Sequence, residues 1–329
     1  MGQVHQAASD TAATMMQHMV LRPHRQVYPT SALGPSRFSF GGLPFKRADF
    51  AVRSRRGLLL QCSHWYRPRG LLSGSQLPRD YAPPCIIYLH TNSGSRIECI
   101  DVLAFALTFG CTLLAFDFGG SGLSEGDHSS LGWYEQEDVR SVVQHLRVSG
   151  GTGPIALWGR SMGAVTAMLY CDSPDGRSSV EGVVLDSPFS DFSAVATDLV
   201  EATSRRGPFS IPGWLAKPYI ANAASTLKTV AGFDPREIDL AAVAQRASVP
   251  AMFLVAEQDE MVPPWHGTKL AREYNSCVPR GLLLFTGDHN CRRPAGVYEA
   301  AADFLAPLLR VPPQAARPVV PVPLNGLRP

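Results

Sequence analysis

The stretch Ile155-Ala-Leu-Trp-Gly-Arg-Ser161-Met-Gly-Ala-Val-Thr-Ala-Met-Leu-Tyr170 joins an apolar run to a helix-like pattern through a short turn. Its centre, Gly159-Arg-Ser161-Met-Gly163, places one serine between two glycines. A G-x-S-x-G turn between a strand and a helix lifts the serine hydroxyl above the edge of a sheet, and the glycines let the two backbones pass closely. Glycine and serine are common turn residues, so the five residues alone are a weak signal. The strand before them and the helix after them favour a nucleophilic serine.

The other apolar runs of the chain do not alternate with polar residues. Such runs are typical of strands covered on both faces, as in a parallel sheet between two layers of helices. Helical spacing fills most of the segments between them, which predicts a mostly parallel, doubly wound α/β sheet. We expect its strands at 85–89, 111–116, 155–158, 183–185, 251–256 and 282–285, preceded by an antiparallel hairpin of 49–53 with 58–66.

Three further segments surround this sheet. Residues 1–46 mix prolines and glycines without a lasting period and predict a flexible N-terminal extension to a domain that spans 47–310. The interval of about 189–247 is too long for a simple crossover and predicts an inserted helical cap over the carboxyl edge of the sheet. Residues 311–329 contain six prolines and predict a flexible or polyproline-like tail, a linker or a ligand for an unknown partner.

Composition excludes several classes of function. The chain carries 30 basic and 28 acidic residues, a net charge of +2, without a block of like charge, so nucleic-acid binding is not expected. The seven cysteines form no C-x-x-C pair, which favours reduced core thiols in a reducing compartment. We expect no transmembrane segment and no signal peptide, and therefore a cytoplasmic protein, with peripheral membrane association left open. The sequence predicts no cofactor and no metal site.

A serine hydroxyl needs an imidazole to take its proton and a carboxylate to orient that imidazole. Only His266 and His289 follow Ser161 in the chain. His289 comes directly after the last predicted strand, where a loop at the carboxyl edge can turn it towards Ser161, so it is the expected general base. His266 stands at a predicted helix start and is expected to be a surface or capping residue.

Asp259 is the expected orienting acid. It lies three residues beyond the end of an apolar strand, in a loop at the same edge of the sheet as His289. Glu257 and Glu260 are its neighbouring rivals. Asp186, at the end of the preceding strand, is a more serious competitor because it also lies at this edge, and its structural interpretation is a loop or helix cap before Pro188.

Acyl transfer also requires hydrogen-bond donors for the developing oxyanion, each worth roughly 3 to 4 kcal/mol. The amide of Met162 opens the helix after the serine and supplies one donor, with support from the helix dipole. The second is expected from residues 90–96, the loop after the strand at 85–89. His90 itself is expected to hold this loop through hydrogen bonds.

These features together resemble the α/β-hydrolase superfamily over roughly residues 49–309. The likeness is closest to serine hydrolases of the Bem46-like and monoglyceride-lipase or serine-aminopeptidase-like branch. It rests on the H-x-N loop at His90, the glycine-rich turn 117–126, the elbow at 159–163 and the positions of Asp259 and His289. The resemblance implies an α/β-hydrolase fold with an inserted helical cap.

The resemblance also implies roles for single residues. Ser161 would be the nucleophile, Asp259 the orienting acid and His289 the general base, with the oxyanion hole formed by the amides of Asn92 and Met162. The family's usual H-G pair is His90-Thr91 in this chain. That departure leaves Thr91 or Ser93 open as the second donor in place of Asn92.

The function implied is that of a serine hydrolase, which cleaves a carboxylic ester or thioester through an acyl-enzyme intermediate. Its substrate would be a small-molecule acyl ester, an acyl thioester or a lipid-like compound. Two alternatives remain at this point. One is a peptidase or aminopeptidase of the same fold, and the other is a non-catalytic binding protein that keeps the fold.

Overall fold

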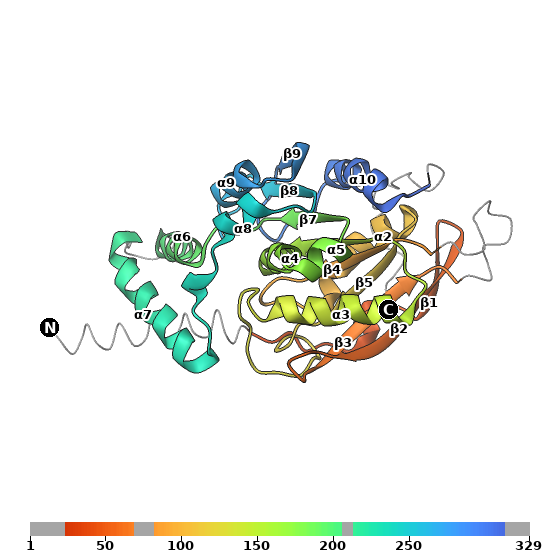
Figure 1. Ribbon diagram of the computed structural model, residues 1–329, viewed down its shortest axis with the longest axis horizontal. Helices are drawn as coiled ribbons and strands as arrows, with labels where there is room; N and C mark the ends of the chain where they lie inside the picture. The colour runs from red at the N-terminus through yellow and green to blue at the C-terminus, as the bar shows by residue number, and fades with distance from the viewer. Residues whose placement is uncertain (1–23, 69–81, 206–212, 313–329) are drawn as a thin grey trace.

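The computed structural model describes residues 24–68, 82–205 and 213–312, and these build one nine-stranded sheet with helices on both faces (Figure 1). The strand order is β1-β2-β3-β5-β4-β6-β7-β8-β9. The strands are β1 Arg37–Phe40, β2 Leu43–Arg53, β3 Leu59–Tyr66, β4 Cys85–Leu89, β5 Thr112–Phe116, β6 Ile155–Arg160, β7 Gly182–Asp186, β8 Ala251–Ala256 and β9 Cys277–Phe285. The α-helices are α2 Ile100–Thr108, α3 Glu135–Ser149, α4 Met162–Asp172, α5 Pro174–Ser179, α6 Phe192–Arg205, α7 Gly213–Ala231, α8 Leu240–Arg246, α9 Pro264–Glu273 and α10 Ala295–Leu309. Short 3₁₀ helices are η1 Thr30–Leu33, η3 Arg96–Cys99 and η4 Pro235–Glu237.

The topology confirms the predicted doubly wound sheet. From β5 to β9 all neighbouring strands run parallel, and the predicted opening hairpin, β2 with β3, is antiparallel. Parallel strands end at one common edge, so the loops that follow β6, β8 and β9 meet there. This edge brings residues far apart in the sequence within reach of one another.

The strand β4 explains why the central strands read as unbroken apolar runs. Cys85, Ile87 and Leu89 enter the core that packs against α3, α4, α8 and α9. Ile86 and Tyr88, which alternate with them, enter a second core beneath α2 and α10. Because side chains on a strand alternate between its faces, a sheet covered on both sides needs an apolar residue at every position.

The expectation for residues 24–46 was wrong. Arg37–Phe40 form β1, which pairs antiparallel with the start of β2, and Phe38 stacks on Phe45 with ring centroids 5.6 Å apart. Arg25 donates to the carbonyl of Gly122 at 2.7 Å. The prolines and glycines here make the turns between short elements, which hides the pattern from a periodicity argument. The folded unit therefore extends at least to residue 24, and residues 1–23 lie outside the described part of the chain.

The interval predicted to form a cap contains α6, α7, η4 and α8. The helices α6 and α7 lie at the left of Figure 1, to one side of the sheet, and pack against each other. In contrast, α8 lies against α4, where the Arg246 guanidinium pairs with the Asp172 carboxylate at 2.5 Å. The helix α8 is thus part of the layer that covers the sheet.

The predicted Pro-rich tail falls mainly on residues 313–329, outside the described part. Of the residues just after α10, Val311 is buried and its amide donates to the carbonyl of Ala306 at 3.1 Å. Within the described ranges, no helix has the length and apolar character needed to cross a bilayer.

Candidate active site

Ser161 sits in a sharp turn between β6 and α4. Its φ of 53° and ψ of −117° lie in a region that a non-glycine residue rarely adopts, at a cost of roughly 1–3 kcal/mol. The turn needs both glycines, because a Cβ on Gly159 would lie 2.2 Å from the Gly163 carbonyl oxygen, and one on Gly163 would lie 2.1 Å from that of Leu89. The local geometry is that of the predicted elbow, with the serine at the apex.

Asp259 and His289 meet at the same edge of the sheet. Asp259 follows β8, His289 follows β9, and His289 Nδ1 lies 2.6 Å from Asp259 Oδ2, with both residues 4% exposed. The other carboxylate oxygen of Asp259 accepts the amides of Met261 and Val262 at 2.9 and 2.8 Å. The aspartate is therefore fixed by its own loop and offers one oxygen to the imidazole.

Two of the rival acids, Asp186 and Glu257, have partners other than His289. Both carboxylate oxygens of Asp186 accept the buried Arg293 guanidinium at 2.8 Å. Burial opposes the charged form of Arg293, but the negative charge of Asp186 and its hydrogen bonds together raise the pKa of Arg293. The exposed Glu257 accepts a hydrogen bond from the hydroxyl of Thr286 at 3.2 Å. Among the candidate acids, Asp259 is the one in hydrogen-bond contact with the His289 imidazole.

The elbow and the histidine loop are connected through the backbone of His289. In the described structure the Ser161 hydroxyl and the His289 imidazole are not hydrogen-bonded. Arg160, the residue before Ser161, donates from Nη2 to the carbonyl of His289 at 2.5 Å. Catalytic hydrogen bonds are often long or poorly aligned in a ligand-free enzyme and tighten when the substrate binds.

The loop after β4 carries the residues expected to complete an oxyanion hole. The amide of Thr91 donates to Glu98 Oε2 at 3.1 Å, which disfavours Thr91 as the second donor. Asn92 Oδ1 accepts the Ser129 hydroxyl at 2.6 Å, and that hydroxyl lies 3.2 Å from Met162 Sδ. Ser129 thus contacts both residues proposed for the oxyanion hole.

His90 holds its own loop through hydrogen bonds, whereas the role of Met162 in an oxyanion hole stays a prediction. His90 Nδ1 lies 2.7 Å from the carbonyl of Thr91, and its Nε2 accepts the amide of Phe118 at 3.0 Å, so both ring nitrogens hold the loop. Met162 is the first residue of α4. An amide at the start of a helix has no partner inside that helix, so it can point at an anion.

His266 is not the surface residue that the sequence suggested. It is fully buried, its Nδ1 accepts the Ser190 amide at 3.1 Å, and its Nε2 lies 3.0 Å from Asp198 Oδ2. An accepting Nδ1 places the proton of the neutral ring on Nε2, which donates to Asp198. Trp265 Nε1 donates to the same carboxylate oxygen at 2.9 Å. Because Asp198 belongs to α6, these bonds fasten that helix to α9.

The residues that sequence reasoning missed at this edge are Arg160, Arg293 and Ser129. Each acts through a partner that is distant in the chain: Arg160 and His289 are separated by 129 positions, and Arg293 and Asp186 by 107. Arg160 lies inside the quoted elbow, and adjacency to Ser161 was the only signal available. Arg293 follows His289 closely and had no pattern of its own.

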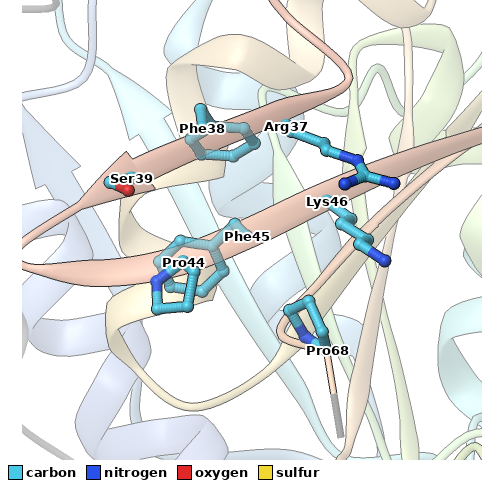
Figure 2. A pocket seen from close by; sticks show the side chains of 7 residues that line it. All are labelled: Arg37, Phe38, Ser39, Pro44, Phe45, Lys46 and Pro68. Carbon is cyan, nitrogen blue, oxygen red and sulfur yellow. The ribbon is translucent and has the colours of Figure 1, made fainter. Parts of the chain in front are cut away.

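A shallow hollow at the outer strands lies apart from this set of residues. Figure 2 shows it between β1 and β2, with Arg37 and Lys46 directly opposite each other on the two strands. None of its lining residues belongs to the predicted site. Across the described ranges, no group of three or more His, Cys, Asp or Glu side chains is placed to hold a metal ion.

The thiols are mostly interior, as expected. Of the described cysteine side chains, all are free, and only Cys291 is partly exposed. Burial raises the pKa of the Cys62 and Cys85 thiols to about 12, which keeps them protonated. The side chain of Cys277 lies outside the described set.

Two comparisons place the fold among known structures. An esterase of Pyrococcus furiosus, Pf2001, superposes with a TM-score of 0.60 at 19% identity, covering 87% of this chain and 98% of the esterase. Est1E of Butyrivibrio proteoclasticus, with ferulic acid bound, gives a TM-score of 0.55 at 18% identity over 79% of this chain and 99% of Est1E. At these identities the likeness concerns the fold alone.

The sequence relatives cover the chain in part. An uncharacterized protein of Bacillus subtilis, YqkD, is 30% identical over 189 residues, which is 56% of this chain and 58% of YqkD. The rat lysophosphatidylserine lipase ABHD12 is 28% identical over 209 residues, 60% of this chain and 46% of the lipase. The matched segments span about half the length of these curated relatives. The model of the alpha/beta hydrolase family matches residues 86–321, more than half of the chain, and the chain belongs to that family.

Proposed function

We propose that the chain is a serine hydrolase that cleaves carboxylic esters or thioesters through an acyl-enzyme. Ser161 Oγ attacks the carbonyl carbon while its proton passes to His289 Nε2. The amides of Met162 and Asn92 stabilise the oxyanion, and the alcohol or thiol departs with the proton from His289. A water molecule then gives its proton to His289 and its oxygen to the acyl carbon, which releases the acid and restores Ser161.

The contact between Asp259 and His289 is the observation that carries this proposal. At 2.6 Å the buried carboxylate accepts the Nδ1 proton of the imidazole, which leaves Nε2 as the proton acceptor. A general base in this tautomer stands at the edge where β6 presents Ser161 at a φ of 53°. Strained backbone of this kind persists where the surroundings over-determine it, often at functional sites.

An acyl or lipid-like substrate is the favoured class, with α6 and α7 as the cap beside the acyl group. The relatives that are lysophosphatidylserine lipases support a lipid ester. A peptidase that grips a free amino group would need an uncommitted carboxylate in this region. Asp198 already accepts from Trp265 and His266, and Asp234 accepts from Arg236 at 2.7 Å. These three contacts commit two of the acidic side chains of this region to other partners, which supports the esterase over the aminopeptidase.

The experiment is a substrate screen with purified protein. p-Nitrophenyl esters and acyl thioesters of graded chain length are compared with aminoacyl anilides, each against a Ser161→Ala variant. We expect turnover of esters or thioesters and none by the variant. A preference for anilides would replace the esterase with a peptidase, and equal turnover by Ser161→Ala would remove the assigned nucleophile.

A further inference from the structure

The loop that carries His289 is wrapped around one buried arginine. Arg293 is 6% exposed, and its Nη1 donates to the carbonyl of Cys291 at 2.8 Å and to that of Asp288 at 3.4 Å. Its Nη2 donates to the carbonyl of His289 itself at 3.2 Å. One guanidinium thus contacts three backbone carbonyls of this loop. One belongs to His289 itself, and the other two belong to residues before and after it in the chain.

The same guanidinium is anchored to the sheet beneath the elbow. Its Nε and Nη2 donate to the two carboxylate oxygens of Asp186, both at 2.8 Å. The carbonyl of Asp186 in turn accepts the amide of Ser161 at 2.8 Å. The ion pair therefore connects the residue that supports the serine backbone with the loop that carries the histidine.

We propose that Arg293, paired with Asp186, is a positioning residue that sets the place of His289 relative to Ser161. This inference rests on the proposed function. Asp259 orients the imidazole ring through Nδ1, whereas Arg293 fixes the backbone from which the ring extends. The guanidinium of Arg160 donates to the same His289 carbonyl from the side of the elbow, so that one oxygen is held from two directions.

The chemistry explains why an arginine is needed here. A planar guanidinium presents several donors in a fixed fork, so it can bind a carboxylate with two of them and direct the others to carbonyls. A lysine ammonium keeps the charge but cannot hold this geometry. Because a misplacement of about 1 Å can cost about 100-fold in rate, loss of the fork is expected to lower kcat.

The test compares Arg293→Ala and Arg293→Lys with the wild type on the best p-nitrophenyl ester. We expect kcat to fall by about 100-fold in both variants with little change in KM, and millimolar guanidinium to restore about 10-fold to Arg293→Ala alone. The matched control is Arg246→Met, which removes an exposed arginine-aspartate pair at the far end of α4 and should keep wild-type kcat without rescue. Circular dichroism confirms that each variant is folded.

Three results would overturn the inference. They are a wild-type kcat in folded Arg293→Ala, full activity in Arg293→Lys, or a loss that guanidinium does not reverse. Should Arg293→Ala fail to fold, the Lys variant and Asp186→Asn are measured in the same way, and the inference requires both to lose kcat. If the wild type itself shows no turnover and no labelling at Ser161, the proposed function has failed, whereas unchanged kcat in the variants rejects only the role of Arg293.

Discussion

Two groups of serine, histidine and aspartate can be compared in the described part of the chain, and we propose that the Ser161 group is the catalytic one. At the sheet edge, Asp259 contacts His289, and both follow parallel strands, β8 and β9, that end at the same edge of the sheet as β6. Beneath α6, His266 lies between Ser190 and Asp198 with contacts of 2.8 and 3.0 Å. By hydrogen bonds alone the second group is the more complete, since it joins all three side chains.

The backbone around the serine distinguishes the two groups. Ser190 is 3% exposed, and both its amide and its hydroxyl donate to His266. Its hydrogen-bonding groups are therefore used within the protein interior, and its φ is not positive as that of Ser161 is. Ser161 heads a helix whose first amides can stabilise an anion. A triad is therefore recognised by the surroundings of its serine, and the His266 group acts as a structural clamp between α6 and α9.

Replacement of the serines gives the largest expected contrast. Ser161→Ala should lose about 10⁶-fold in kcat, as expected for removal of a catalytic serine. Ser190→Ala removes one hydrogen bond in a buried cluster and should keep kcat within a few-fold while it lowers the free energy of unfolding by about 1 kcal/mol. Steady-state ester hydrolysis and urea unfolding of both variants measure these effects. A larger loss of kcat in Ser190→Ala would reverse the assignment.

Replacement of the two aspartates should distinguish the two groups in the same way, with smaller effects on kcat and on stability. Asp259→Asn favours the wrong tautomer of His289 and should cost about 10⁴-fold in kcat. Asp198→Asn weakens the acceptor of Trp265 and His266 and should cost about 1–3 kcal/mol of stability, mainly at α6. Hydrogen exchange of α6 and kcat are measured together. The comparison fails if Asp198→Asn impairs kcat as strongly as Asp259→Asn.

The clamp should also respond to pH. Burial lowers the pKa of His266, against the opposing effect of Asp198 and Asp191, and Lys269 acts in the same direction as burial. Because the folded pKa lies below the unfolded value of about 6.5, the contribution to stability is complete above that pH and is lost as the pH falls towards the lowered pKa. Unfolding free energies of wild type and His266→Gln should therefore differ most above pH 6.5. A difference that grows on acidification would contradict the assigned neutral state.

Trp265→Phe should give the smallest effect. It removes one donor to Asp198 from a side chain that is 43% exposed, and His266 still donates to the same oxygen. A loss of about 0.5–1 kcal/mol in unfolding free energy and an unchanged kcat are expected. A strong fall in kcat would mean that the indole contacts the substrate.

The sheet and the three proposed catalytic residues could be read from the sequence because each depends on local pattern. Apolar runs mark the central strands, and Ser161, Asp259 and His289 follow directly where three of them end. The short strand β1 could not be found, since Arg37–Phe40 is too brief for a period and lies among turn residues. The start of the folded domain was therefore predicted at residue 47, although the structure has folded elements before that residue.

Contacts that long side chains make across the fold could not be predicted from the sequence. Arg293 finds Asp186 over 107 positions, and His266 finds Ser190 and Asp198 over 76 and 68. Such pairings depend on which strands and helices become neighbours, and neither composition nor local pattern indicates these neighbours. His266 at a helix start resembled a capping residue until the position of α6 supplied its partners.

Labelling with a fluorophosphonate, followed by peptide mapping of the adduct, would identify the activated serine. The reagent phosphonylates a serine that an imidazole activates, so its attachment point reports which group is catalytic. We predict one adduct per chain, on Ser161, and its loss in Ser161→Ala but not in Ser190→Ala. No adduct on the folded protein, or an adduct on Ser190 or another residue, would contradict the account.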